Sequence, residues 1–141
     1  QAALAAAYLV CLLLFQKDYY SDYRQVAGAY FAQGLKECVD FAWEQCQERQ
    51  ITSITVEKGA QWPRLLLYTE TLPSEYLASV VYDTAPAPAS FETRGIRINT
   101  RINYDTLDPE SVYIIYYTDL PVFEENYTLA KFHDWYVAVP R

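Results

Sequence analysis

The chain opens with an uninterrupted apolar run and then changes to a mixed pattern of apolar and polar positions. Residues 2–15 read AALAAAYLVCLLLF, and Gln16 and Lys17 end the run. Crossing a bilayer takes about 20 apolar residues, so this run predicts the end of a membrane-spanning helix rather than a complete span. A buried, alanine-rich helix of a soluble protein is the alternative that the length of the run leaves open.

A helical pattern follows the apolar run. From Asp18 to about Gln50, apolar residues recur at steps of three and four, which is the period of an amphipathic helix. Gly34 interrupts this pattern and indicates close packing or a break. A short helix is expected over residues 61–71 with Pro63 in its first turn, and a further turn begins near Pro73.

Strand patterns dominate the second half of the chain. Residues 112–118, VYIIYYT, would place apolar side chains on both faces of a strand, which predicts a central strand covered on both sides. Alternation of polar and apolar residues predicts the other strands, at residues 51–58, 77–83, 91–104 and 132–139. The expected fold class is α/β: a mixed layered sandwich in which a long N-terminal helix packs on a mixed sheet of about five strands.

Composition narrows the possible partners. The 141 residues suit one folded domain over residues 16–141, after the membrane segment of residues 1–15. A formal net charge of −7 excludes nucleic acid as an expected partner and disfavours anionic lipid. The chain contains no methionine, so we expect it to be part of a longer or processed product whose upstream residues complete the span. The three cysteines are expected to be free and to act as small apolar residues.

Few residues carry recognisable chemistry. His133, the only histidine, lies beside Asp134 in an expected strand, where neighbouring side chains point to opposite faces and cannot cooperate. No nucleophile elbow, zinc motif or phosphate loop is present, and the late carboxylates lack the spacing of a calcium loop. The sequence therefore predicts no catalytic residue, no metal site and no cofactor in this chain.

Three arginines are the candidate binding residues. Arg97 and Arg101, with Arg94 nearby, are expected on the polar face of one strand in an otherwise acidic protein. Their guanidinium groups could bind a phosphate or an acidic sugar. The alternative is an exposed face on which the arginines pair with Glu92 or Asp105.

Several segments together resemble a known type of domain. They are YYSDYRQVAGAYFAQGLKECVDF with its F-x-x-G-L step, LLLYTETLPSEYLASVVYD, the strand VYIIYYTD and the terminal FHDWYVAVPR. This combination is similar to the C-terminal extracytoplasmic domain of bacterial polytopic membrane glycosyltransferases of the protein-mannosyltransferase and aminoarabinose-transferase type. The resemblance covers nearly the whole chain and rests on hydrophobic motifs.

The resemblance implies a function without a catalytic centre in this chain. In that family the catalytic acids lie in a loop of the membrane region and the donor is a lipid-linked sugar, so no catalytic residue is carried over. The implied function is that of a non-catalytic domain on the outer face of the cell membrane, aiding acceptor binding for the rest of the parent protein. The alternative is an extracellular glycan- or peptide-binding module anchored by a single helix.

Overall fold

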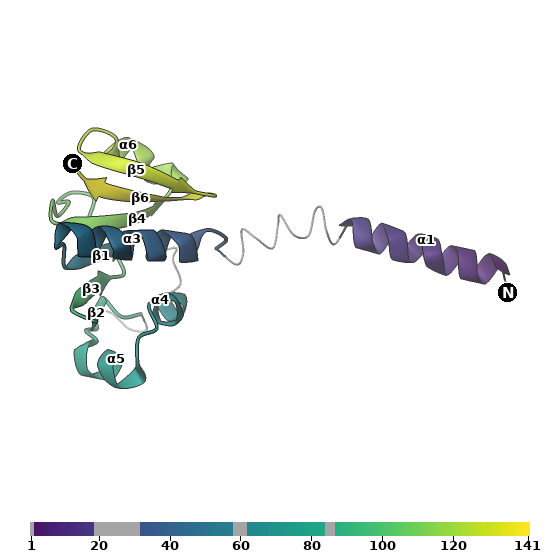
Figure 1. The fold of residues 1–141 in the computed structure, drawn as a ribbon, viewed down its shortest axis with the longest axis horizontal. Coiled ribbons are helices and arrows are strands. Elements are labelled where there is room, and N and C mark those ends of the chain that lie inside the picture. Colours follow the sequence, from purple (N-terminus) through teal and green to yellow (C-terminus); the bar gives the residue numbers. More distant parts are fainter. Residues whose placement is uncertain (1, 19–31, 58–61, 84–86) are drawn as a thin grey trace. The chain divides into compact units, whose positions relative to one another are not determined.

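The computed structural model describes residues 2–18, 32–57, 62–83 and 87–141 (Figure 1). The chain divides into two units, Gln1–Gln33 and Gly34–Arg141. Most of the expected helix between Asp18 and Gly34 lies outside the described residues. Each unit is therefore considered by itself.

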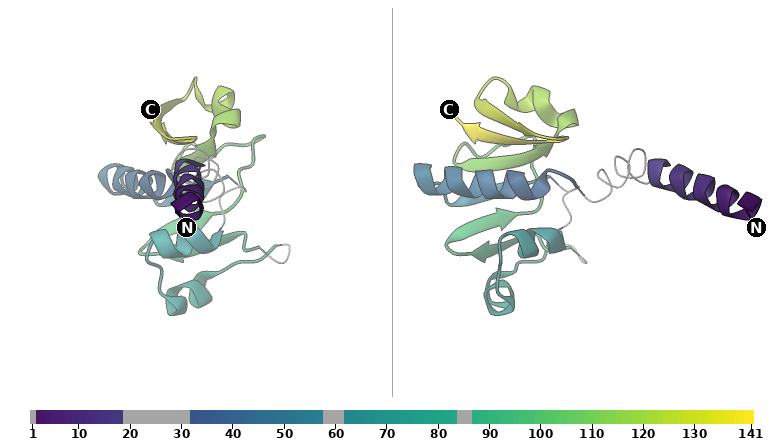
Figure 2. Two further views of the ribbon diagram at one scale, coloured as in Figure 1. Left: turned by 90° about the vertical axis from the view of Figure 1, so that its right-hand side faces the viewer. Right: turned by 45° about the vertical axis from the view of Figure 1, so that its right-hand side comes forward.

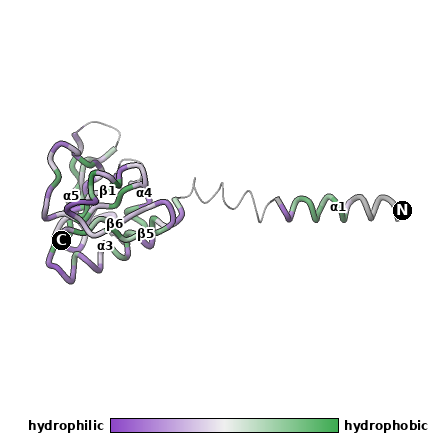
Figure 3. The backbone as a smooth tube through the Cα atoms, turned by 90° about the horizontal axis from the view of Figure 1, so that it is seen from above, coloured by the Kyte–Doolittle hydropathy of each residue, from purple (hydrophilic) through white to green (hydrophobic). Residues whose placement is uncertain are grey.

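The first unit contains helix α1, Ala2–Asp18, in which Lys17 supplies a positive charge to the last turn. Its side chains from Leu12 to Phe15 are all exposed. The stretch of α1 that leads to its polar end is hydrophobic (Figure 3). Among the described residues, no helix combines the length and the apolar character that crossing a membrane requires.

The second unit is built on a mixed sheet. Six strands lie in the order β2-β3-β1-β4-β6-β5, with β1 parallel to β3 and β4 and the remaining neighbours antiparallel. The strands are β1 (Ser53–Val56), β2 (Ser90–Thr93), β3 (Ile96–Asn99), β4 (Ser111–Tyr116), β5 (Tyr127–Phe132) and β6 (Trp135–Pro140). Strand β4 has β1 on one side and β6 on the other, and five of its six residues are buried. The prediction of a central strand at residues 112–118 is confirmed.

Helix α3, Leu35–Arg49, covers one face of this sheet (Figures 1 and 2). It begins at Gly34, whose φ of 91° lies in the left-handed region, so the helical pattern does break where the glycine indicated. Five side chains at helical spacing are buried: Leu35, Cys38, Val39, Ala42 and Cys46. Strands β1 and β4 supply alternate residues to the same face, among them the buried Ile54 and Ile114. The α/β class and the helix-on-sheet arrangement are confirmed, with six strands in place of about five.

The other face of the sheet has two different halves. Over β4, β6 and β5, short helix α6 (Leu120–Phe123) covers an apolar cluster that includes Tyr113, Phe123 and Tyr127. A single 3-10 turn, η2 (Tyr117–Asp119), leads into α6. Over β1 and β3 the corresponding positions are polar and are joined by hydrogen bonds between hydroxyl and amide groups.

Two short helices occupy the connection between β1 and β2. They are α4 (Trp62–Tyr68) and α5 (Pro73–Ser79), and the expected turn near Pro73 is therefore a full helix. The prediction of a strand at residues 77–83 is wrong, because Pro73 starts a helix and Glu75 bonds back to its cap residue, Leu72. Only Val81 makes a bridge to β2, through Ser90.

Two other expected strands are hairpins. Residues 91–104 form β2 and β3 around a two-residue turn, Arg94-Gly95, and the irregular segment that follows begins at Thr100. Residues 132–139 contain the His133-Asp134 turn between β5 and β6. Positive φ at Arg94, Gly95 and His133 allows these tight turns, which apolar–polar alternation does not reveal. His133 and Asp134 therefore lie in a turn and not in a strand as expected.

Candidate functional site

The three candidate arginines do not come together in one site. Arg94 lies in the β2–β3 turn, Arg97 on β3, and Arg101 beyond the end of that strand. Each makes an ion pair with a carboxylate: Arg94 with Glu70 at 2.9 Å, Arg97 with Glu92 at 2.9 Å and Arg101 with Asp83 at 3.0 Å. Exposed pairs of this kind contribute about 0–1 kcal/mol, so a ligand with well-placed groups can displace them.

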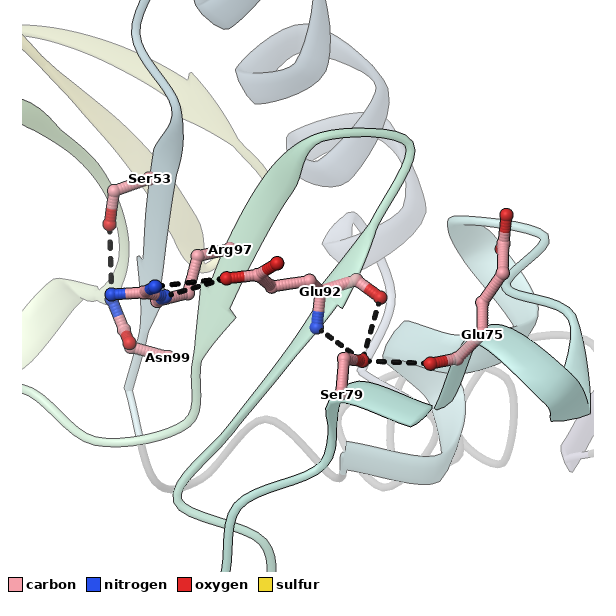
Figure 4. Close-up of polar contacts among 6 residues, drawn as sticks. All are labelled: Ser53, Glu75, Ser79, Glu92, Arg97 and Asn99. Atoms are coloured by element: carbon pink, nitrogen blue, oxygen red, sulfur yellow. Dashed lines mark hydrogen bonds and ion pairs between the residues drawn. The ribbon is translucent and has the colours of Figure 1, made fainter. Parts of the chain in front are cut away.

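Arg97 belongs to the polar half of the sheet face (Figure 4). Its Nε and Nη2 both donate to Oε1 of Glu92, the residue directly opposite on β2. Beside it, the Asn99 amide donates to Ser53 Oγ at 3.0 Å. A hollow of about 330 Å³ adjoins these residues, and Asp108 and Glu110 also line it. With three carboxylates around one guanidinium, this hollow disfavours the phosphate or acidic sugar that the sequence suggested for the arginines.

The hydroxyl of Ser79, in helix α5, bonds to the backbone of strand β2. Ser79 Oγ accepts from the backbone N–H of Glu92 at 2.9 Å and also lies within hydrogen-bonding distance of the carbonyl oxygens of Glu75 and Glu92 (Figure 4). Strand β2 is the last strand on this side of the sheet. The end of α5 therefore occupies backbone groups that an edge strand would otherwise leave unpaired.

Arg94 adopts a backbone conformation that is unfavourable for its residue type. Its φ is 49° and that of Gly95 is 79°, as the two central positions of a type I′ hairpin turn require. Asn, Asp and Gly are the residues that such a turn prefers, whereas other L-residues in the left-handed region cost about 1–2 kcal/mol. The guanidinium carbon of Arg94 lies 6.0 Å from the ring centroid of Trp43, on helix α3. This turn thus holds a strained arginine over an aromatic ring.

Trp43 and Arg94 line a hollow of about 500 Å³ between α3, α4 and the β2–β3 turn. Its walls carry two cations and two carboxylates as two ion pairs, Lys36 with Asp40 at 2.5 Å and Arg94 with Glu70. The hydrogen bond and the charge of Asp40 raise the pKa of Lys36, so this lysine remains charged at neutral pH. We call this site the Trp43 hollow.

The chemistry of the Trp43 hollow suits a neutral, hydroxylated ring. An indole offers an apolar face, and the ion pairs around it present both donors and acceptors without an excess of either charge. Pockets that bind small ligands combine aromatic walls with a few placed polar groups in this way. Of the three candidate arginines, only Arg94 takes part in such a site. The sequence did not indicate Trp43 and Lys36 as site residues, because they meet Arg94 only through contacts between α3 and a hairpin that is distant in the sequence.

A pair of carboxylates lies elsewhere: Glu57 directly follows β1, and Asp119 ends the η2 turn that follows β4. Burial and the charge of Asp119 raise the pKa of Glu57, while a hydrogen bond from the Tyr116 backbone opposes this shift. Oδ2 of Asp119 is buried without a hydrogen-bond partner, and burial together with Asp119 raises the pKa of Tyr104. The sequence carried no clear signal for this pair, because Glu57 lies inside the strand expected at residues 51–58. No group of three or more metal-binding side chains occurs in the part of the chain that the structure describes.

No protein-family model, curated protein or solved structure matches the chain. The fold class therefore rests on the structure alone.

Proposed function

We propose that residues 34–141 form a non-catalytic glycan-binding domain of a membrane glycosyltransferase, which holds the acceptor sugar in the Trp43 hollow. The observation that carries the proposal is the position of Arg94. Backbone strain persists where the surrounding structure maintains it, and strained residues are concentrated at ligand sites. An asparagine would fit the turn better, whereas an arginine extends a guanidinium over Trp43.

The resemblance noted in the sequence supports the wider context of this proposal. It implies that a lipid-linked sugar is the donor, that the transfer chemistry belongs to the membrane part of the parent protein, and that α1 continues into that part. The domain then lies on the extracytoplasmic side of the cell membrane. Neutral electrostatics in the Trp43 hollow favour an uncharged acceptor glycan over the charged donor.

Binding can be measured directly by titrating the full chain with neutral disaccharides, such as maltose and cellobiose, while recording tryptophan fluorescence. We expect Arg94→Asn to weaken binding about tenfold or more, because a hydrogen bond to a charged group contributes about 1.5–3 kcal/mol. The same substitution should leave the free energy of unfolding unchanged or raise it, because asparagine suits the turn. Unaltered affinity in Arg94→Asn would contradict the proposal.

A matched tryptophan control is available within the chain. Trp43→Leu removes the aromatic wall of the hollow and should abolish the fluorescence response together with binding. Trp62→Phe changes a tryptophan that does not line the hollow, and it should leave the affinity for the sugar unchanged. Equal effects of the two substitutions would show that the hollow is not the binding site.

Glycosyl-transfer activity of the full-length parent protein distinguishes a membrane glycosyltransferase from a binding module anchored by a single helix. In a glycosyltransferase that uses this domain to bind the acceptor, Arg94→Asn should raise the KM for the acceptor and change kcat little. A module anchored by a single helix would bind the same sugars, but the full-length protein would transfer none. A parent enzyme whose acceptor KM is unaffected by both Arg94→Asn and Trp43→Leu would exclude the proposed role.

A further inference from the structure

Helices α4 and α5 expose a patch of large apolar side chains. Leu67, Leu72 and Leu77 are 73%, 59% and 74% exposed, although leucine is among the residues most often buried. The patch, which we call the α4–α5 patch, comprises these three leucines, the exposed Pro73 and Tyr82, and the half-buried Trp62, Leu66 and Tyr76. Contiguous exposed apolar surface of this kind marks a contact with another protein or with a membrane.

Tyr76 joins the parts of this patch. Its ring stacks on Trp62 with centroids 5.8 Å apart and an interplanar angle of 5°. Its hydroxyl lies 2.9 Å from that of Tyr82. Together with Leu66, Leu67 and Leu77, it lines a shallow apolar trough of about 650 Å³. The aromatic side chains of the patch thus have apolar bodies and, in the two tyrosines, polar tips.

This composition matches the boundary between lipid headgroups and acyl chains. Tryptophan and tyrosine are enriched there because one end of each side chain is apolar and the other is wet. Amphipathic helices with leucine and aromatic residues on one face lie in that boundary, with the apolar face buried to a depth of about 5–10 Å. The exposed leucines of α4 and α5 supply the apolar face.

Other features of the chain favour a lipid surface over a protein partner. Residues 2–15 of helix α1 are all apolar, which is typical of a helix in an apolar environment. The 16 residue steps from Asp18 to Gly34 reach at most about 55 Å, which keeps the domain near any bilayer that holds α1. This tether also raises the effective concentration of the patch at the bilayer, so weak contacts suffice.

Charge decides which lipid surface is suitable. The chain has a formal net charge of −7, and Glu70 lies in the wall of the trough itself. Anionic headgroups would therefore be repelled, whereas a zwitterionic surface carries no net charge to oppose contact.

We propose that the α4–α5 patch docks the domain on the surface of a zwitterionic bilayer, with its leucines and Trp62 entering the headgroup–acyl boundary. This proposal rests on the membrane tether of the proposed function, but it does not require sugar binding. It assigns the domain a second contact with the membrane in addition to α1.

Fluorescence quenching by lipid tests the docking directly. The full chain is reconstituted with phosphatidylcholine vesicles whose acyl chains carry bromine, and the difference between wild type and Trp62→Phe gives the fluorescence of Trp62. We expect bromine to quench this fluorescence at least twofold. The double variant Leu72→Ser/Leu77→Ser should remove the quenching and still fold, because both leucines are exposed and serine suits the cap position of α5.

Control measurements separate the possible outcomes. Val122→Ser removes an exposed apolar side chain of α6, outside the patch, and should leave the quenching unchanged. If the wild-type chain floats with vesicles but Trp62 is not quenched, α1 binds the bilayer and the docking of the patch is refuted. A wild-type chain that does not float with vesicles would refute both the tether and the docking. Sedimentation without vesicles tests for a dimer. If the wild type is a dimer that Leu72→Ser/Leu77→Ser dissociates, and Trp62 is not quenched in vesicles, the patch binds a second copy of the chain and the proposal is overturned.

Discussion

Replacing Gly34 by alanine tests how closely helix α3 approaches the β5–β6 hairpin. A Cβ atom at this position would lie 2.5 Å from the backbone oxygen of Phe132 and 3.1 Å from Cβ of His133. The obstructing atom is a backbone carbonyl oxygen, which cannot rotate away as the end of a flexible side chain can. Gly34 also has a φ of 91°, a conformation that L-residues rarely adopt.

The two effects can be estimated separately. The left-handed backbone conformation costs an alanine about 1–2 kcal/mol, and forcing extra volume into a packed contact costs about 1–3 kcal/mol. Gly34→Ala should therefore lower the free energy of unfolding by about 2–5 kcal/mol. This is a large fraction of the 5–15 kcal/mol that is typical of a domain.

Gly95 provides the matched control. Its φ of 79° is also left-handed, but a Cβ atom there would meet nothing within 4 Å. Gly95→Ala should therefore cost only the conformational part, about 1–2 kcal/mol. Urea unfolding of both variants, with similar m-values, measures the difference. Equal losses in the two variants would refute the close approach of α3 to the hairpin.

Four further predictions concern buried and bridging groups. Ser111→Ala removes the bond of a fully buried hydroxyl to Thr55 at 2.9 Å, and urea unfolding should show a loss of about 1–3 kcal/mol. Thr128→Ala, at an exposed position of β5, should show almost no loss. Ser79→Ala releases the Glu92 backbone N–H, and hydrogen exchange at that amide should accelerate, with a loss of about 1 kcal/mol in stability. Burial raises the pKa of Cys38 and Cys46 to about 12, so at pH 8 both remain neutral thiols, and mass spectrometry should find them alkylated only after unfolding. Burial and the charge of Asp119 raise the pKa of Glu57 in the folded state. The contribution of Glu57 to stability is therefore complete below its unfolded pKa near 4.5 and is lost as the pH rises through the folded pKa. Glu57→Gln should flatten this pH dependence and stabilise the domain at pH 7, as measured by thermal unfolding at several pH values.

Residues with a strong local pattern were predictable from the sequence. The buried positions of α3 follow the helical period because an amphipathic helix must place its apolar face on the sheet. Strand β4 was recognised because both of its faces are covered, so no polar position interrupts it. The break at Gly34 was also visible, because glycine in a helical pattern indicates an unusual backbone conformation or a close contact.

Tight turns and long-range contacts were not predictable in the same way. Arg94-Gly95 and His133-Asp134 lie inside alternating runs, and neither is among the pairs that usually signal a two-residue hairpin. The pairing of Arg94 with Glu70, and its place over Trp43, depend on how α3, α4 and the hairpin pack together. A sequence shows which residues can carry a site, whereas tertiary packing decides which of them meet.

Two departures from local rules adjoin one another in this domain. Arg94 takes a turn position that asparagine or glycine would fill with less strain, and α4 and α5 expose leucines that the core does not use. The Trp43 hollow and the apolar trough share two lining residues, Leu67 and Glu70. Natural sequences depart from local rules mainly at functional sites. The shared lining residues therefore favour one continuous functional surface over two unrelated unfavourable features. If the α4–α5 patch rests on a bilayer, the Trp43 hollow next to it is held close to that bilayer. The hollow would then be in reach of an acceptor glycan that is attached to the membrane.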